Sequence, residues 1–334
     1  MPRSTVVVTL QRTQSDRDER GEMAAEVAAG FSEPLPSIPS KYFYDDRGSR
    51  LFEEITRLPE YYQTRTEEGI LESIAPRVVA RVRPSELVEL GSGASRKVLI
   101  LLDALAAARR LEACVLFDIN EGDVRESVAR LGLLHPEAEV RGVVGDFMTD
   151  DLAALGTGGG RLLAFLGGTI GNLHPTDVPP FLRRTASVLE PGDGFLLGVD
   201  LVKDVARVEA AYNDTAGVTA EFNRNILRVL NDRLGADFEP EAFEHVAFYD
   251  ADNAWIEMRL RATKPMRVRI RAAGVDHGFE SGDEIRTEIS CKYTRASLEA
   301  LLAGTGLAIT DWFTDRERLF AVALLGRRRG PARA

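Results

Sequence analysis

The chain has 334 residues. This is more than a single domain of ~100–200 residues needs, so one large or two moderate domains are expected. With 44% hydrophobic and 28% charged residues, it has the composition of a globular protein with a sizeable core. Its 52 acidic and 42 basic side chains give a net charge of -10, which argues against nucleic acid or an anionic membrane as a partner.

Cysteine and histidine are sparse. Cys114 and Cys291 are too few for a disulfide scaffold, and the four histidines are scattered, so no metal site is predicted. No run approaches the ~18 apolar residues of a membrane span, and residues 1–22 lack the apolar core of a signal peptide. We therefore expect a cytoplasmic protein with a flexible leader at 1–22 and a short solvated tail at 328–334. We also expect a monomer, which no feature of the sequence itself indicates.

Short apolar runs alternate with longer helical stretches between residues 86 and 200. The predicted strands are 86–90, 113–118, 139–144, 161–166 and 195–200. The predicted helices between them are 98–105, 124–131 and 178–189. Strands separated by helices indicate a parallel sheet with right-handed crossovers, covered on both faces.

The pattern changes after Asp200. Residues 203–234 are predicted to be helical, and residues 243–291 to form antiparallel strands, at 254–262, 266–272 and 284–292. A helix at 296–302 then precedes strands at 307–313 and 319–325, expected as an antiparallel hairpin at the edge of the sheet. The prediction is an α/β domain, at 67–200 plus 292–327, with an inserted α+β domain formed by 201–291 and the aromatic segment 23–66.

Ligands of an open parallel sheet bind outside the carboxyl ends of its strands, so the residues that follow each strand are informative. Gly91-Ser92-Gly93 follows the first strand and lets backbone approach a ligand closely. Position 96 is Arg, so the dinucleotide pattern G-x-G-x-x-G fails, which favours a ligand without a pyrophosphate.

Polar residues also follow the next three strands. Asp118 is placed to accept hydrogen bonds from a ribose diol, and Asp146 and Phe147 suit an adenine amino group and ring. Asn172 ends a glycine-rich loop after the fourth strand. In this order the residues resemble the S-adenosylmethionine site of class I (Rossmann-like) methyltransferases, with a nicotinamide-dependent dehydrogenase as the nearest alternative.

Long strings of this sequence resemble the histidine-specific methyltransferase family of ergothioneine biosynthesis. The strings include Tyr42-Phe43-Tyr44-Asp45, Leu58-Pro59-Glu60-Tyr61-Tyr62-Gln63-Thr64-Arg65-Thr66-Glu67, Phe165-Leu166-Gly167-Gly168-Thr169-Ile170-Gly171-Asn172, Phe222-Asn223-Arg224-Asn225 and Glu288-Ile289-Ser290-Cys291-Lys292. The resemblance implies that S-adenosylmethionine is the cofactor and that L-histidine is trimethylated on its α-amino group to give hercynine. It also assigns substrate recognition to the inserted domain.

The resemblance further implies roles for individual residues. Its cofactor-binding positions are Gly91, Gly93, Lys97, Asp118, Asp146 and Phe147. Its substrate-binding positions are Tyr61 and Tyr212 for the carboxylate, Asn172 for the amino group, Glu288 and Ser290 for the imidazole, Met258 along the ring, and Phe52 and Gly167 near the amine. The catalytic residues expected around the reacting amine are Tyr44, Asn172 and Tyr212. Gly168 departs from the family pattern, which has serine there.

Elementary chemistry agrees with this distribution of charge. A carboxylate against the α-nitrogen would favour the protonated, non-nucleophilic form, whereas tyrosine and amide groups would not. Glu288 suits the opposite end of the substrate, where it can accept a hydrogen bond from an imidazole N–H. Its two-residue spacing to Ser290 places both side chains on one face of a strand.

Other interpretations remain open from sequence alone. Glu288 could face solvent, Tyr61 could only pack, Met258 could be a plain core residue, and Asn172 could serve only an Asx turn. The same scaffold could methylate tryptophan or tyrosine, although an indole would prefer a more apolar site than Glu288 offers. A non-catalytic cofactor-binding protein is the third possibility.

Overall fold

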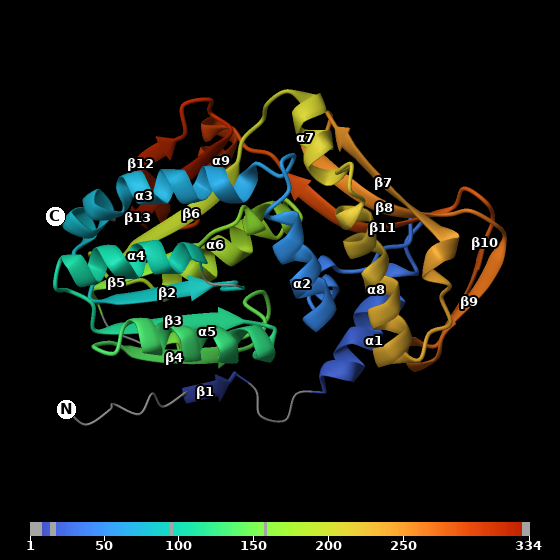
Figure 1. Ribbon diagram of the computed structural model, residues 1–334, viewed down its shortest axis with the longest axis horizontal. Helices are drawn as coiled ribbons and strands as arrows, with labels where there is room; N and C mark the ends of the chain where they lie inside the picture. Colours follow the sequence, from blue (N-terminus) through green and yellow to red (C-terminus); the bar gives the residue numbers. More distant parts are fainter. Residues whose placement is uncertain (1–8, 14–17, 94–95, 157–158, 329–334) are drawn as a thin grey trace. The chain divides into compact units, whose positions relative to one another are not determined.

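The computed structural model describes residues 9–13, 18–93, 96–156 and 159–328. The chain divides into two compact units (Figure 1). The sheet unit comprises Met1–Ser15, Gln63–Val202 and Lys292–Ala334, and the insert unit comprises Asp16–Tyr62 and Lys203–Cys291. The predicted boundaries were 66/67, 200/201 and 291/292.

The sheet unit is built on one mixed sheet whose order, in the described residues, is β1-β4-β3-β2-β5-β6-β13-β12. The strands are β1 (Thr9–Arg12), β2 (Glu86–Leu90), β3 (Ala113–Asp118), β4 (Glu139–Val144), β5 (Arg161–Phe165), β6 (Gly194–Asp200), β12 (Leu307–Thr314) and β13 (Phe320–Arg327). Neighbours from β4 to β6 pair in parallel, whereas β13 pairs antiparallel with both β6 and β12. The five predicted parallel strands and the antiparallel edge hairpin are confirmed.

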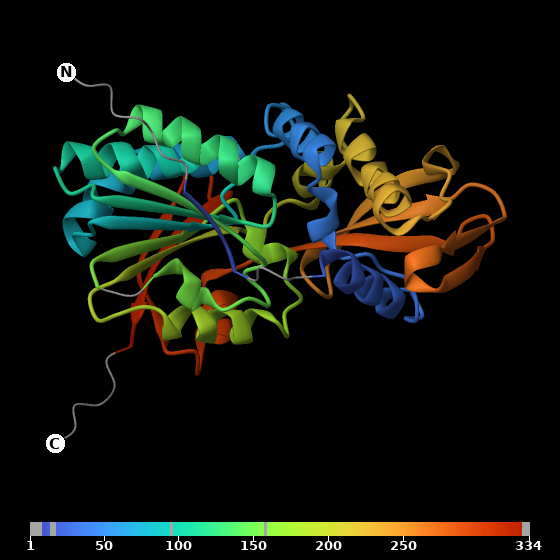
Figure 2. The same ribbon diagram turned by 90° about the horizontal axis from the view of Figure 1, so that it is seen from below.

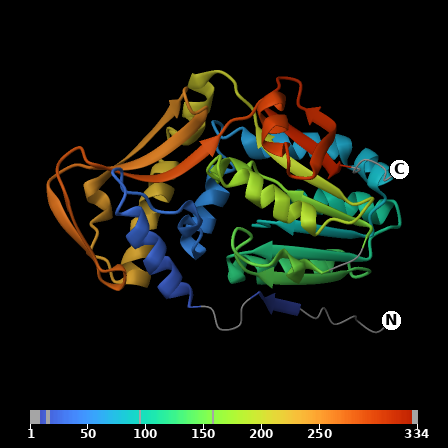
Figure 3. The same ribbon diagram turned by 180° about the vertical axis from the view of Figure 1, so that it is seen from behind.

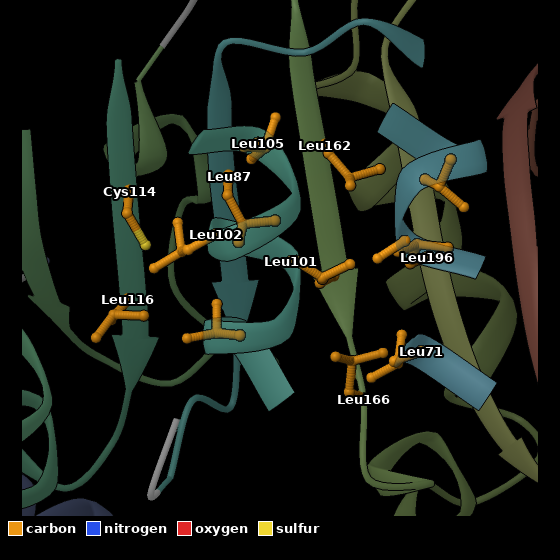
Figure 4. Packing of buried hydrophobic residues seen from close by; sticks show 14 of the residues in the cluster. Leu71, Leu87, Leu101, Leu102, Leu105, Cys114, Leu116, Leu162, Leu166 and Leu196 are labelled. Carbon is orange, nitrogen blue, oxygen red and sulfur yellow. The ribbon is translucent and has the colours of Figure 1, made fainter. Parts of the chain in front are cut away.

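Helices cover both faces of this sheet. Figure 2 shows α3, α4 and α5 (blue to green) on one face and α6 and α9 (yellow-green and red) on the other. The helices are α3 (Gln63–Val82), α4 (Arg96–Ala107), α5 (Glu121–Leu134), α6 (Val178–Ser187) and α9 (Arg295–Leu302), with 3₁₀ turns η2 (Leu152–Leu155) and η3 (Thr169–Asn172). Leucines at helical spacing on α4, such as Leu101, Leu102 and Leu105, pack against strand residues such as Leu87 and Leu162 (Figure 4).

The N-terminal segment differs from the expected flexible leader. Thr9–Arg12 forms β1, which pairs in parallel with β4 at the edge of the sheet, as Figures 1 and 3 show in dark blue. Its side chains are mostly exposed, so no apolar alternation marked it as a strand. Most other residues of the expected leader (1–8, 14–17) and of the expected tail (329–334) lie outside the described residues.

The insert unit combines a three-stranded antiparallel sheet, ordered β11-β8-β7, with a β9-β10 hairpin. The strands are β7 (Phe243–Asp250), β8 (Trp255–Ala262), β9 (Met266–Ile270), β10 (Val275–Phe279) and β11 (Glu284–Cys291). The helices are α1 (Glu19–Gly30), α2 (Asp46–Ile55), α7 (Val205–Tyr212) and α8 (Val218–Leu234), with 3₁₀ turns η1 (Ser40–Phe43), η4 (Pro240–Ala242) and η5 (Arg271–Ala273).

The predicted helical stretch 203–234 is therefore two helices. They are separated at Gly217, which has φ +74 and precedes the first residue of α8. Strands β7 and β10 were not predicted individually. None of the helices in the described ranges is both long and apolar enough to cross a bilayer.

Candidate active site

The loop after β2 presents its backbone. Gly91 and Gly93 have φ of +69 and +43, in the left-handed region that favours glycine. The N–H of Gly93 donates to Oδ2 of Asp118 at 3.1 Å. Among the described residues, a Cβ at Gly93 would meet no atom within 4 Å. The loop can therefore bring backbone close to a small ligand.

Asp118 ends β3 and is held by two backbone donors. Its Oδ1 accepts from the N–H of Asn120 at 3.0 Å, while Oδ2 accepts from Gly93. Burial raises the pKa of Asp118, and these N–H donors act in the opposite direction. A carboxylate has about four lone-pair positions. The orientation of Asp118 is therefore fixed while capacity remains for a diol.

Asp146 and Phe147 follow β4. Asp146 is buried, and its Oδ1 accepts from the N–H of Met148 at 2.8 Å. Phe147 lies edge-on to Phe165 with ring centroids 5.1 Å apart. A Cβ at Gly91 would lie 3.9 Å from Phe147. The loops after β2 and β4 are thus neighbours at the carboxyl edge of the sheet, where the strand order reverses around β2 and β5.

The loop after β5 carries Gly167 and Gly168, with φ of +80 and +69, and ends in the half-buried Asn172 of η3. A side chain at a left-handed position costs roughly 1–2 kcal/mol. Gly168 therefore avoids a strain that serine would carry here. The N–H of Gly167 and the ammonium of Lys97 both donate to the carboxylate of Glu67.

Several buried polar atoms of this unit lack a hydrogen-bond partner among the described residues, and two of them lie on β2 and in the glycine loop that follows it. These two are Oε2 of Glu89, on β2, and Oγ of Ser92, in the loop that follows. Burial raises the pKa of Glu89 well above its usual range. Buried polar atoms without a partner are uncommon in proteins. A polar ligand such as S-adenosylmethionine, bound beside the glycine loop, would supply a partner for these two. In the part of the chain that the structure describes, no three His, Cys, Asp or Glu side chains lie close enough together to hold a metal ion.

In the insert unit, Phe222 of α8 is the centre of an aromatic cluster. Its ring lies 5.8 Å from Tyr44 and 6.0 Å from Phe52, and Phe52 lies 6.1 Å from Tyr61. Phe43 stacks on Phe222 at 4.5 Å. Three residues that the resemblance assigned to the substrate therefore belong to one cluster. A tyrosine such as Tyr44 or Tyr61 can pack its ring in this cluster and still bind a ligand through its hydroxyl.

Met258, Glu288 and Ser290 share one face of the antiparallel sheet. In the β11–β8 register Glu288 is opposite Met258 and Ser290 is opposite Ile256, and all four residues are buried. The register shifts between Arg286 and Glu288. This bulge places Glu288 and Ser290 on the same face as Met258. In a regular strand, continuing from Arg286, they would lie on the opposite face. At 9% exposure, Glu288 does not face solvent.

Thr287, at the bulge, is pinned by a buried amide. Its hydroxyl lies 2.6 Å from Oδ1 of Asn223 and 3.1 Å from the carbonyl of Met258. Nδ2 of Asn223 contacts Nδ1 of His245 at 2.8 Å, and Nε2 of His245 contacts the carbonyl oxygen of Tyr212, also at 2.8 Å. Because the amide of Asn223 donates to Nδ1 and the carbonyl of Tyr212 accepts from Nε2, we assign His245 as neutral with its proton on Nε2. One network thus links the backbone of Tyr212 to the strand that carries Glu288.

The structure groups the predicted residues by unit. The sheet unit carries its residues at the end of β3, on the loops after β2, β4 and β5, and at the start of α4: Gly91, Gly93, Lys97, Asp118, Asp146, Phe147, Gly167 and Asn172. The insert unit carries Tyr44, Phe52, Tyr61, Tyr212, Met258, Glu288 and Ser290. The roles of these residues stay predictions.

Sequence reasoning gave no role to Glu67, Asn223 or His245, although each contacts or supports a predicted residue. One signal could have revealed Glu67. It lies among Ile70, Leu71 and other buried positions of α3, and a charge within an apolar helical stripe is costly unless paired. No comparable signal marks His245, because its partners come from distant segments.

The strand order, with antiparallel β13 between β6 and β12, and the polar loops after β2 to β5 define a class I S-adenosylmethionine-dependent methyltransferase. The histidine-specific, S-adenosylmethionine-dependent methyltransferase family matches residues 23–327. The chain belongs to this family.

Two bacterial proteins are similar to nearly the whole chain. Histidine N-alpha-methyltransferase of Mycolicibacterium smegmatis is 46% identical over 299 residues, covering 90% of this chain and 93% of that protein. The protein of the same name from Mycobacterium tuberculosis is 43% identical over 309 residues, covering 92% and 96%. Ergothioneine biosynthesis protein 1 of Neurospora crassa is 31% identical over 301 residues, covering 84% of this chain and 32% of the fungal protein.

Proposed function

We propose that this chain transfers three methyl groups from S-adenosylmethionine to the α-amino group of L-histidine, giving hercynine, in ergothioneine biosynthesis. Family membership and the names of the two bacterial relatives support the substrate, and the name of the fungal relative supports the pathway. A cytoplasmic monomer remains part of the proposal. The two free, buried cysteines suit a reducing compartment.

The cofactor supplies an electrophilic methyl group with its own leaving group, so the protein contributes mainly positioning and exclusion of water. In this proposal Asp118 binds the ribose, Asp146 and Phe147 bind the adenine, and the glycine loop with Lys97 binds the remainder. Asp118 and Asp146 are each oriented by backbone donors before any ligand arrives, which lowers the cost of binding.

The amine side of the substrate is assigned to neutral groups. Asn172 orients the nitrogen, Tyr44, Phe52 and Gly167 surround it, and Tyr61 and Tyr212 hold the substrate carboxylate. Neutral donors and acceptors leave the amine free to lose its proton before each transfer, whereas a carboxylate at that place would retain it. They also tolerate the quaternary product.

The observation that carries the choice of substrate is the buried face shared by Met258, Glu288 and Ser290. A carboxylate and a hydroxyl on this buried face can pair with two ring nitrogens while Met258 packs on the ring. An indole or phenol would leave the buried carboxylate of Glu288 less well paired, which is costly. Methylation of tryptophan or tyrosine is therefore the second candidate.

A competition assay tests this choice. The enzyme is incubated with S-adenosylmethionine and equal amounts of histidine, tryptophan and tyrosine, and methylated products are followed by mass spectrometry. We expect mono-, di- and trimethylated histidine and far less of either other product. Preferential methylation of tryptophan or tyrosine would replace the first proposal by the second.

A further inference from the structure

Glu67, on α3, is a fully buried carboxylate of the sheet unit. It is 0% exposed, and the buried residues that follow it on the helix are apolar. One turn further along, Leu71 lies beside Leu166, which directly precedes Gly167 (Figure 4). A carboxylate in such surroundings is retained only where hydrogen bonds and a cation compensate for its desolvation.

That compensation comes from two predicted site residues. The N–H of Gly167 donates to Oε1 and Oε2 of Glu67 at 3.0 and 2.8 Å. The ammonium of Lys97 donates to Oε2 at 2.8 Å. One carboxylate therefore joins the first turns of α3 and α4 to the loop that leads to Asn172. Charge-assisted bonds of this kind are about twice as strong as neutral ones.

Two glycines make room for this arrangement. A Cβ at Gly198, on β6, would overlap Oε1 of Glu67. A Cβ at Gly167 would lie 3.0 Å from the Lys97 ammonium, at a φ of +80 that side chains rarely adopt. The missing side chain at Gly198 thus leaves room for the Glu67 carboxylate, and the missing side chain at Gly167 leaves room for the Lys97 ammonium that binds it.

We propose that Glu67 is a positioning residue that holds the Gly167 amide and the Lys97 ammonium on one carboxylate, and so sets the affinities for cofactor and for histidine together. This inference rests on the proposed function for the histidine side. Lys97 is assigned to the cofactor and the Gly167–Asn172 loop to the substrate amine. Loss of the Glu67 carboxylate therefore releases one protein group assigned to the cofactor, Lys97, and one assigned to the substrate, Gly167, at the same time.

The test compares Glu67→Gln with the wild type and with Glu72→Gln, which changes an exposed glutamate on the same helix. The dissociation constant of S-adenosylhomocysteine is measured by calorimetry, the KM for histidine by turnover, and folding by thermal melting. For Glu67→Gln we expect both the dissociation constant and the KM to rise by about tenfold. Glu72→Gln should change neither.

Two further variants separate positioning from simple stabilisation. Glu67→Asp keeps the charge but shortens the reach, so we expect it to recover most of the cofactor affinity and less of the histidine affinity. It also carries the test if Glu67→Gln does not fold. Adding Lys97→Met to Glu67→Gln should weaken S-adenosylhomocysteine binding less than Lys97→Met does alone, because the ammonium is already released.

Two results would overturn the inference. A lower melting temperature of Glu67→Gln with both affinities unchanged would leave Glu67 with a structural role only. A change in cofactor affinity with an unchanged KM would remove the link to the substrate loop. The calorimetric measurement needs no turnover, so it remains informative even if histidine proves not to be the substrate.

Discussion

The two units build their candidate ligand-binding residues by different physical means. In the sheet unit, loops after parallel strands present backbone N–H groups and short acidic side chains, and left-handed glycines such as Gly91 let the chain approach a ligand. In the insert unit, side chains on an antiparallel face carry the chemistry, and a β-bulge with a buried amide decides which of them share that face. A site on loops follows from topology, whereas a site on a strand follows from register.

The largest expected effect tests the insert unit. Glu288→Ala should lower kcat/KM for histidine by about a hundredfold, because it removes a buried charged partner of the imidazole. Calorimetry should show unchanged affinity for S-adenosylhomocysteine. Glu288→Gln, which keeps the shape, should retain more activity than Glu288→Ala. Equal loss of cofactor and substrate binding in Glu288→Ala would argue against the division between the units.

The converse variant tests the sheet unit. Asp118→Asn should raise the dissociation constant of S-adenosylhomocysteine by about tenfold, because an amide accepts hydrogen bonds from a diol less well than a carboxylate. The KM for histidine, measured at saturating S-adenosylmethionine, should stay near the wild-type value. A selective rise in that KM would place Asp118 on the substrate side.

A smaller effect is expected at Thr287, in the bulge that sets the register of β11 against β8. Thr287→Val removes the hydroxyl that bonds Asn223 and leaves a buried amide oxygen without its donor, at a cost of about 1–3 kcal/mol in unfolding free energy. We expect a severalfold higher KM for histidine with cofactor affinity unchanged. Urea denaturation and steady-state kinetics measure the two effects. Unaltered kinetics in a destabilised variant would separate the bulge from substrate recognition.

The smallest effect concerns pH. Burial lowers the pKa of His245 from its ordinary value of 6.5, so the folded protein binds a proton less readily than the unfolded chain. The free energy of unfolding that neutral His245 contributes is fully present above pH 6.5. It is lost as the pH falls from 6.5 through the lower pKa of the folded state. Urea denaturation of the wild type should show this decrease, and His245→Gln should lack part of it. His174→Gln, an exposed histidine in the sheet unit, should behave like the wild type.

The contrast between the units also explains what the sequence could predict. Alternating strands and helices placed Asp118, Asp146 and Asn172 at strand ends, and the carboxyl ends of parallel strands converge by rule. The relation between Glu288 and Met258 depends on one extra residue at Thr287, which no periodicity marks. Strand β1 was missed because its four described residues are mostly exposed and carry no alternating apolar pattern.

Buried polar networks were the other limit. Glu67 lies on an otherwise apolar helical stripe and could have been noticed, but its partners come from elsewhere in the chain, Gly167 from the loop after β5 and Lys97 from the start of α4. Asn223 and His245 join segments 22 residues apart on α8 and β7. Such contacts depend on tertiary packing, which local propensity does not encode.

The central claim is methylation of the α-nitrogen of histidine. The most direct test is the NMR structure of the product formed from L-histidine and excess S-adenosylmethionine. The account predicts a single trimethylammonium signal correlated with the α-carbon and an unmodified imidazole ring. Methyl groups on a ring nitrogen, or an unmodified α-amine, would contradict it.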